Sequence, residues 1–468
     1  MERLIKTGEI KVKNSKEIKE SKMGLGFEKL DRDAFDPSQC YDKIADTGVK
    51  WIRIQSGWAK TEKQKGIYDF KWLDDVVDKL IENGLKPWLC LCYGNGLYSE
   101  KAREVMGAVG IAPIFDEESK KAWANYVMAT VKHYKGRIDT FEVWNEPDGI
   151  WCWKTGVNAT ELGHFTIDTA KAIKEENKEA YIIGGVFWQR ELSFINEALT
   201  TGMGDYIDAI SFHEYSADER GVLERVSGLR GLGRLYGREF DIVQGESGSQ
   251  SQTSKAGALK TGAWTQRKQA KQLLRHAMID MKADVKFTSY FSCMDMREAL
   301  SGLKCEPGGY QDFGYFGVLG AQFDGYGRVM GGYKPKMSYR ALQSLSSVFC
   351  DGAEICDLPV ILIPQESPRV FANDLSVNDI IYQGFKKPNG SYAYAYWAPT
   401  DIMTSDFEST ISLQAVYKGD DIKIVDLMDG GIYKLPEKMY EKDSYGVYKI
   451  NNLPVKDYPM LIMFGDFE

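Results

Sequence analysis

The sequence predicts an α/β protein in which a (β/α)₈ barrel is followed by a β-sandwich domain. Short apolar runs alternate with amphipathic helical patterns over about residues 24–348, and eight such runs occur there. Beyond about residue 350, short β-rich runs and turn signals replace the helical patterns. We therefore predict a barrel over residues 23–349 and a sandwich over residues 350–468, preceded by an N-terminal segment, residues 1–22.

The barrel strands are expected at the apolar runs, and the helices where hydrophobic residues recur with helical spacing. The expected strands are 23–27, 49–54, 87–92, 140–144, 181–187, 208–212, 240–243 and 285–291. The expected helices are 71–83, 117–134, 161–176, 191–199 and 336–348. The first of these helices has the clearest period, because Leu73, Val76 and Leu80 fall on one face.

An open, doubly wound sheet is the alternative arrangement for alternating strands and helices. Such a sheet usually carries a glycine-rich phosphate-binding loop after its first strand. Here the first run holds only Gly24-Leu25-Gly26, without a third glycine, and the sequence contains no P-loop motif. The barrel is therefore the favoured arrangement.

The region after residue 350 is typical of a β-sandwich. Runs 360–363, 380–382 and 392–396 have the composition of strands, and Asn389-Gly390 is a hairpin signal. The early segment 4–12 could contribute a further strand to the same domain.

Composition is that of an ordinary globular protein and argues against two classes of partner. Of the 468 residues, 43% are hydrophobic and 27% are charged, and a net charge of −8 gives no sign of a nucleic-acid or membrane-surface partner. No apolar run approaches the length of a membrane span. Aromatic residues make up 12%, which also suits a protein that stacks on sugar rings.

Cysteine and histidine usage argues against a metal site or another cofactor. The eight cysteines show no paired C-x-x-C motifs, and the four histidines form no H-E-x-x-H pattern. Free thiols, together with a start that lacks a signal-peptide pattern, favour a cytoplasmic location. A secreted or periplasmic location would require a leader that is removed.

Two strand-like runs end in a carboxylate and carry most of the functional information. The first is F-E-V-W-N-E-P at residues 141–147, and the second is D-I-V-Q-G-E-S at residues 241–247. In a parallel barrel, the C-terminal ends of the strands form the active site. Glu146 and Glu246 are therefore expected to face each other across the barrel mouth, as the two carboxylates of a glycosidase do.

The W-N-E-P string after a fourth barrel strand resembles the acid/base motif of clan A glycoside hydrolases. Within that clan the sequence is most similar to glycoside hydrolase family 39, which contains β-xylosidases and α-L-iduronidases. The resemblance covers about residues 24–348 and extends loosely to the C-terminal sandwich. It implies that Glu146 is the general acid/base, that Glu246 is the nucleophile, and that Asn145 binds the sugar 2-hydroxyl.

The same resemblance implies roles for polar residues on two other strands. Arg53, near the end of the second strand, would bind the nucleophile and hold it ionised, although a structural ion pair is the alternative. His213-Glu214-Tyr215 follows the sixth strand, and Tyr215 would donate its hydroxyl to the nucleophile. His213 would contact the substrate or the same network, and core packing is the alternative for both residues.

Other residues just past strand ends are expected to line the pocket. They are Trp58, Tyr93, Asn95, Trp151, Trp153 and Trp188, with Glu28 as a further candidate for hydroxyl recognition. Loop packing is the alternative for Trp151 and Trp153.

Many clan members carry a tryptophan platform at the end of strand eight, and this chain departs from that pattern. Phe291 or Tyr290 could replace it there, or Trp264 from elsewhere. Asp295 and Arg297 could contact substrate hydroxyls or a carboxylate.

The sequence therefore predicts a retaining glycoside hydrolase that acts by double displacement and needs no cofactor. Its partner would be an oligosaccharide or glycoside, and a β-xyloside-like substrate cleaved from the chain end is expected. A non-catalytic carbohydrate-binding barrel and a transglycosylase with the same carboxylates are the alternatives. An aldolase would want a lysine at a strand end, whereas Lys50 and Lys286 lie near strand starts.

Overall fold

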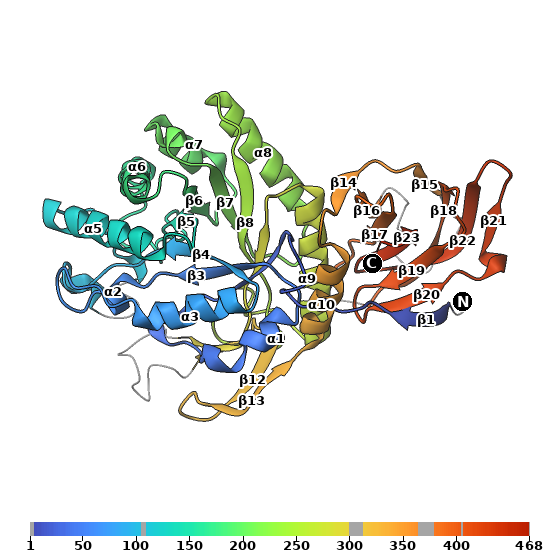
Figure 1. Cartoon of the computed structure of the whole chain (residues 1–468), viewed down its shortest axis with the longest axis horizontal. Helices are drawn as coiled ribbons and strands as arrows, with labels where there is room; N and C mark the ends of the chain where they lie inside the picture. Colours follow the sequence, from blue (N-terminus) through green and yellow to red (C-terminus); the bar gives the residue numbers. More distant parts are fainter. Residues whose placement is uncertain (1–3, 104–108, 299–311, 364–378, 404–405, 468) are drawn as a thin grey trace.

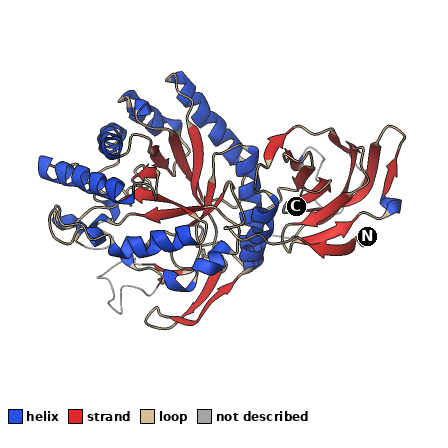
Figure 2. Cartoon of the chain, in the orientation of Figure 1, coloured by secondary structure: helices blue, strands red, loops and turns tan. Residues whose placement is uncertain are grey.

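The computed structural model describes residues 4–103, 109–298, 312–363, 379–403 and 406–467 of the chain. It places a barrel and a β-sandwich side by side, with helices α9 (Gln266–Lys282) and α10 (Met337–Val348) at their boundary (Figure 1). The predicted fold class, a barrel with a C-terminal sandwich, is confirmed. Figure 2 shows the contrast in secondary structure between the helix-covered barrel and the strand-rich sandwich.

Within the described residues, eight parallel strands close into a barrel, and each overlaps one predicted run. They are β2 (Met23–Gly26), β3 (Trp51–Gln55), β4 (Lys86–Leu91), β5 (Thr140–Val143), β6 (Tyr181–Phe187), β7 (Ala209–Glu214), β8 (Asp241–Ser247) and β9 (Thr288–Tyr290). Strands β2 and β9 close the ring, with Met23 opposite Thr288. A layer of buried side chains that includes Trp88, Val243 and Phe287 fills the barrel interior. A binding pocket is therefore expected at the C-terminal ends of the strands.

The predicted helices are present, and the described residues of the barrel include two further long helices, α8 (Gly221–Leu235) and α9, that the sequence pattern did not reveal. The predicted ones are α3 (Lys71–Glu82), α5 (Glu117–Tyr134), α6 (Ala159–Glu176), α7 (Leu192–Thr200) and α10. Helix α8 was missed because its glycines weaken the helical signal. Helix α9 was missed because it is buried on nearly every side, so its polar residues do not mark a solvent face.

Short elements complete the barrel. Helices α1 (Tyr41–Ala45) and α2 (Trp58–Thr61) lie in its first third. Two hairpins follow β9, formed by β10 (Met296–Glu298) with β11 (Asp312–Gly314) and by β12 (Leu319–Phe323) with β13 (Val329–Pro335). These hairpins extend the loops after the last barrel strand.

The sandwich consists of two antiparallel sheets among the described residues. The first has the order β1 (Ile5–Glu9), β20 (Gly431–Lys434), β19 (Ile422–Asp426), β23 (Met460–Phe464), β17 (Tyr392–Trp397), β16 (Ile381–Lys386) and β14 (Glu354–Cys356). The second has the order β15 (Val360–Ile363), β18 (Glu408–Val416), β22 (Val447–Lys456) and β21 (Tyr440–Lys442). The strand expected within residues 4–12 is thus β1, which pairs with β20.

The predicted hairpin at Asn389-Gly390 joins β16 to β17, which pair from Lys386 opposite Tyr392. Gly390 has a φ of 82°, a conformation that side chains disfavour and that explains why glycine stands at this turn.

Buried ion pairs on α9 join the barrel to the sandwich. Lys271 Nζ lies 2.7 Å from Asp457 Oδ2, and each side chain is only 1% exposed. Arg275 pairs with Glu219 at 2.6 Å, and the indole of Trp397 donates to the other oxygen of Glu219 at 2.8 Å. Because an unpaired buried charge is costly, these contacts fix how the two parts pack.

None of the helices in the described parts of the chain combines the length and apolar character needed to span a membrane.

Candidate active site

The C-terminal ends of the barrel strands surround a pocket of about 1250 Å³. Most of the residues predicted for the site line it, and they come from seven different strand ends. They are Glu28, Tyr93, Asn145, Glu146, Trp151, Trp188, His213, Tyr215, Glu246 and Phe291.

Glu146 is presented by a sharp turn directly after β5. Trp144 and Glu146 have φ values of 62° and 43°, which are uncommon for residues with side chains and store strain at this turn. The buried Trp144 ring anchors the turn, because its indole N–H donates to Cys152 O at 2.8 Å. The Glu146 carboxylate accepts from the indole N–H of Trp151 at 2.5 Å.

Glu246 lies at the end of β8 and is held by donors on both oxygens. Arg53 donates to Oε1 through its Nη1, and the hydroxyl of Tyr215 donates to Oε2 at 2.7 Å. Burial opposes the charge of Glu246, but the nearby charges of His213 and Arg53 and the Tyr215 hydrogen bond outweigh it and lower the pKa. Burial and the charge of Glu246 raise the pKa of Tyr215, which therefore stays a proton donor.

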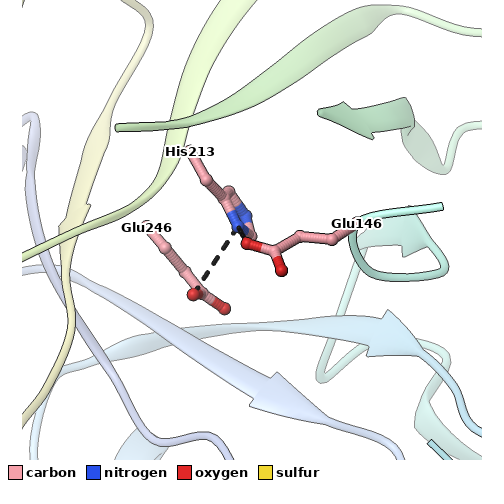
Figure 3. Close-up of side chains that lie close together, drawn as sticks. All are labelled: Glu146, His213 and Glu246. Carbon is pink, nitrogen blue, oxygen red and sulfur yellow. Dashed lines mark hydrogen bonds and ion pairs between the residues drawn. The ribbon is translucent and has the colours of Figure 1, made fainter. Parts of the chain in front are cut away.

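His213 lies between the two carboxylates (Figure 3). Its Nδ1 is 2.8 Å from Glu146 Oε1 and 3.6 Å from Glu246 Oε2. One atom from each of the three side chains falls within 4.8 Å of the others. This separation is close to the distance of about 5 Å found between the two carboxylates of retaining glycosidases.

A divalent cation is the other ligand that such a trio could hold, because it offers two carboxylates and an imidazole. Both oxygens of Glu246 already accept hydrogen bonds from Arg53 and Tyr215. A cation would have to compete with the guanidinium for the same oxygen. The donor set therefore fits a hydrogen-bonded carboxylate pair better than a metal centre.

Glu142, inside β5, belongs to the network around Glu246 and was missed by the sequence reasoning. It is fully buried, accepts from Arg53 Nε at 3.0 Å and also from Arg53 Nη2. The indole of Trp88 donates to its Oε2 at 3.2 Å. Arg53 also donates to Asn145 Oδ1 at 2.8 Å, so one guanidinium orients both the β5 motif and Glu246. An acidic residue in an otherwise apolar strand was the signal available.

Glu28 adds a third carboxyl to the same cluster. Its Oε1 is 3.4 Å from Arg53 Nη1, and its Oε2 has no hydrogen-bond partner among the described residues. Burial and the charge of Glu246 raise the pKa of Glu28 to about 8. The raised pKa favours the neutral form of Glu28 beside the ionised Glu246.

Three side chains expected in the pocket lie in the packed core around it. Trp58 is fully buried and donates to Glu62 Oε2 at 2.5 Å. Trp153 is fully buried against Trp144, with 6.1 Å between ring centroids. Asn95 is buried and donates to the backbone oxygen of Glu62 at 2.9 Å. A position just past a strand end does not fix the direction of the side chain, which is why these three were misplaced.

At the end of the eighth strand, Phe291 is the aromatic residue that lines the pocket. Its ring packs against Phe316, which also lines the pocket, with 5.1 Å between centroids. Tyr290 is buried away from the pocket with its hydroxyl at the backbone of Ser249. Trp264 donates to Leu259 O and does not line the pocket either.

The two charged residues that follow are engaged elsewhere. Asp295 forms a buried ion pair with Lys336 at 2.6 Å, and Arg297 donates to the backbone oxygen of Asp33. Neither lines the pocket. Their place near the strand end suggested substrate contact, but the hairpins after β9 bury Asp295 and turn both away.

Several pocket residues had no sequence signal. Glu298 of β10 lines the pocket, paired with Lys29 at 2.7 Å, and residues 257–260 form another part of the wall. Both segments are brought there by loop folding. Arg190 also lines the pocket and binds Glu214, whose other oxygen is 2.9 Å from Arg225.

Comparisons with known proteins agree with this geometry. Residues 39–226 match the family described as Glycosyl hydrolases family 39. A curated protein from Caldicellulosiruptor saccharolyticus, named Beta-xylosidase, is 26% identical over 204 residues, which cover 38% of this chain and 38% of that protein. The matched part thus spans well under half the length of this curated relative.

Solved structures share the fold over nearly the whole chain. A family 39 glycoside hydrolase from Bacteroides cellulosilyticus WH2 superposes with a TM-score of 0.63 at 16% identity, covering 95% of this chain and 80% of that one. A monomeric beta-xylosidase from Caulobacter crescentus CB15 gives a TM-score of 0.60 at 15% identity, covering 98% and 97%. These likenesses show the fold.

The fold is a (β/α)₈ barrel with a pair of carboxylates at its mouth, an arrangement that also occurs in glycoside hydrolases. Over residues 39–226 the chain is similar to family 39 glycoside hydrolases, and it shares the fold of a solved member of that family.

Proposed function

We propose that the protein hydrolyses O-glycosidic bonds with retention of anomeric configuration. The observation that carries the proposal is the placement of Glu146 and Glu246 on either side of His213, with one atom of each within 4.8 Å of the others. A carboxylate pair at this separation leaves room for direct attack on the sugar, whereas a pair that activates water on the opposite face is wider.

In the first step, Glu146 gives its proton to the glycosidic oxygen while Glu246 attacks the anomeric carbon. The bond from that carbon to the leaving oxygen breaks, and an ester bond to Glu246 forms. Glu246 is suited to this role because Arg53 and Tyr215 hold it as an anion and aim its oxygens. Glu146 is suited to its role because its carboxyl lies at the pocket, where the Trp151 indole and His213 Nδ1 orient it.

In the second step, Glu146 acts as a carboxylate and takes a proton from water. The water oxygen bonds to the anomeric carbon, and the ester to Glu246 breaks. Glu246 leaves as an anion that Arg53 and Tyr215 stabilise again. His213 supports the change of role, because its Nδ1 is within hydrogen-bond distance of Glu146 and close to Glu246.

The substrate class proposed is a β-xyloside or a closely related glycoside, released from a chain end. Its support is the name of two relatives, the Beta-xylosidase of C. saccharolyticus and the beta-xylosidase of C. crescentus. The pocket is lined by aromatic side chains and by polar groups on several strand ends, which is the composition expected of a small-ligand site. No cofactor takes part in the proposed reaction.

The proposal is tested with a panel of 4-nitrophenyl glycosides that differ in sugar and anomeric configuration. We expect turnover of at least one β-glycoside, abolished by Glu246→Ala, with proton NMR showing that the first sugar released has the configuration of the substrate. Inversion would contradict the double displacement. Sugar binding without turnover would indicate a carbohydrate-binding barrel, and transfer to added sugars in preference to water would indicate a transglycosylase.

A further inference from the structure

Two exposed tryptophans stand together on the pocket wall. Trp151 follows β5 and Trp188 follows β6, and both line the pocket. Their ring centroids are 4.8 Å apart at an angle of 53°, and each residue is 41% exposed. The barrel tryptophans Trp58, Trp144 and Trp153 are fully buried by contrast. An exposed aromatic pair inside a pocket is a feature typical of ligand contact.

The two loops that carry these rings are fastened to each other by Asp148. Its carboxylate accepts from the backbone N–H of Gln189 at 2.7 Å and of Trp188 at 3.3 Å. The Gln189 side chain donates back to Asp148 O at 2.5 Å. Asp148 is 1% exposed, so this link is buried and holds the Trp188 loop against the loop of Glu146.

Gly149 leaves room for the Trp151 ring, which packs directly against it. A Cβ atom on Gly149 would lie 2.5 Å from Cε2 of that ring, closer than real contacts allow. Glycine at this position therefore lets the indole fold back over the loop. With the Asp148 link, this close approach shows that the position of the pair is built into the fold.

The pair adjoins the proton donor of the proposed reaction. Trp151 donates its indole N–H to Glu146 Oε2, while the oxygens of Glu246 are held by Arg53 and Tyr215. In a double displacement, the leaving group departs next to the acid and away from the nucleophile. The rings beside Glu146 therefore adjoin the path of the leaving group.

We propose that Trp151 and Trp188 form the leaving-group subsite and bind the flat face of a pyranose or an aryl group. This inference rests on the proposed function. The apolar faces of the rings contact the C–H face of the leaving sugar. Arg190, two residues after Trp188, also lines the pocket and offers a hydrogen-bond donor for the hydroxyls of the leaving sugar. A leaving group as small as methanol would not reach the pair.

The test compares xylobiose with methyl β-D-xyloside, which share a glycone and differ in the size of the leaving group. We expect Trp188→Ala to lower kcat/KM for xylobiose about tenfold more than for methyl β-D-xyloside, because one ring face is lost. Trp188→Phe should recover most of the loss. Tyr445→Ala removes an aromatic side chain that is 84% exposed on the sandwich and is the matched control, expected to leave the ratio unchanged.

A second readout separates the two steps of the reaction. The leaving group is absent from the second step, so Trp188→Ala should not change the rate at which water releases a 2-deoxy-2-fluoroxylosyl enzyme. Acceleration of that release by added xylose, which would bind the same subsite, should weaken about tenfold.

If Trp188→Ala leaves the ratio of kcat/KM for xylobiose to that for methyl β-D-xyloside unchanged, the proposed subsite is wrong. A slowed release by water would show a general structural role and would also overturn it. If the wild-type protein hydrolyses neither these substrates nor any member of the glycoside panel, the proposed function fails. If the wild-type protein is active but Trp188→Ala lowers kcat/KM equally for both substrates, only the subsite fails.

Discussion

The two carboxylates proposed as catalytic, Glu246 and Glu146, occupy contrasting surroundings at one barrel mouth. Glu246 contacts the guanidinium of Arg53 and the hydroxyl of Tyr215, and together with the charge of His213 these lower its pKa against the effect of burial. Glu146 contacts the neutral indole of Trp151 and one nitrogen of His213. The guanidinium of Arg53 favours the ionised form of Glu246, whereas Glu146 has no arginine or lysine contact among the described residues. The neighbours, more than the carboxylates themselves, therefore separate the two roles.

The largest effect is expected from removal of the proposed nucleophile. Glu246→Ala should lower kcat by at least about 10⁴-fold for every leaving group, because the covalent intermediate cannot form. Azide should restore turnover and yield a glycosyl azide of inverted configuration. Glu179→Ala, an exposed residue away from the pocket, serves as the control. Residual activity near the wild-type level would assign the nucleophile elsewhere.

Removal of the acid/base should produce a loss that depends on the substrate. We expect Glu146→Ala to lower kcat/KM about 10³-fold for poor leaving groups and far less for 2,4-dinitrophenol, which departs without a proton. Added azide should now give a product of retained configuration. A uniform loss across leaving groups, measured with a series of substituted phenyl glycosides, would contradict the role of Glu146.

A smaller effect is expected when one hydrogen bond to Glu246 is removed and its carboxylate is kept. Tyr215→Phe deletes the hydroxyl that donates to Glu246 Oε2 at 2.7 Å, so the pKa of Glu246 should rise. The acidic limb of kcat/KM against pH should move to higher pH, and kcat should fall about 10- to 100-fold. The same limb in Phe316→Leu, a pocket-wall variant without this contact, is the control. An unchanged limb would separate Tyr215 from the ionisation of Glu246.

The smallest expected effect concerns Glu28, whose pKa is raised to about 8 by burial and by Glu246. Its charged neighbours are Arg53 from β3 and Glu246 from β8. Above pH 8, the Glu28 anion competes for Arg53, so activity should decline, and Glu28→Gln should shift or remove that alkaline limb.

Stability provides an independent check on Glu28. Because its folded-state pKa is raised, its contribution to stability is present below its unfolded value and is lost as pH rises through about 8. The Tm of Glu28→Gln should therefore fall less between pH 6 and 9 than that of the wild-type protein. Parallel Tm curves would show that Glu28 is ionised throughout this range.

The parts of the molecule that follow local patterns were predictable from the sequence. Strand runs of apolar residues identified the barrel, and the strings around Glu146 and Glu246 identified its mouth. Arg53 and Tyr215 were predicted as partners of Glu246, and the contacts are present. The resemblance to clan A glycoside hydrolases implied both contacts, because Arg53 lies near the end of the second strand and Tyr215 directly follows the sixth.

The features that depend on loop direction or on tertiary packing could not be predicted. Trp58, Trp153 and Asn95 follow strand ends yet turn into the core, because loops do not impose a regular side-chain direction. Helix α9 is buried on nearly every side although it is rich in polar residues, and some of these, such as Lys271, pair with the sandwich. Glu298 reaches the pocket through a hairpin that no local pattern reveals.

The central claim, that Glu246 is the nucleophile and Glu146 the proton donor, is tested most directly by trapping the covalent intermediate. The protein is incubated with 2,4-dinitrophenyl 2-deoxy-2-fluoro-β-D-xyloside, or with the same derivative of the sugar that the glycoside panel identifies, and is then digested for peptide mass spectrometry. We predict one fluoroglycosyl group per chain, attached to Glu246, together with a burst of dinitrophenol. A label on Glu146, or sugar released with inverted configuration and no label, would contradict the account.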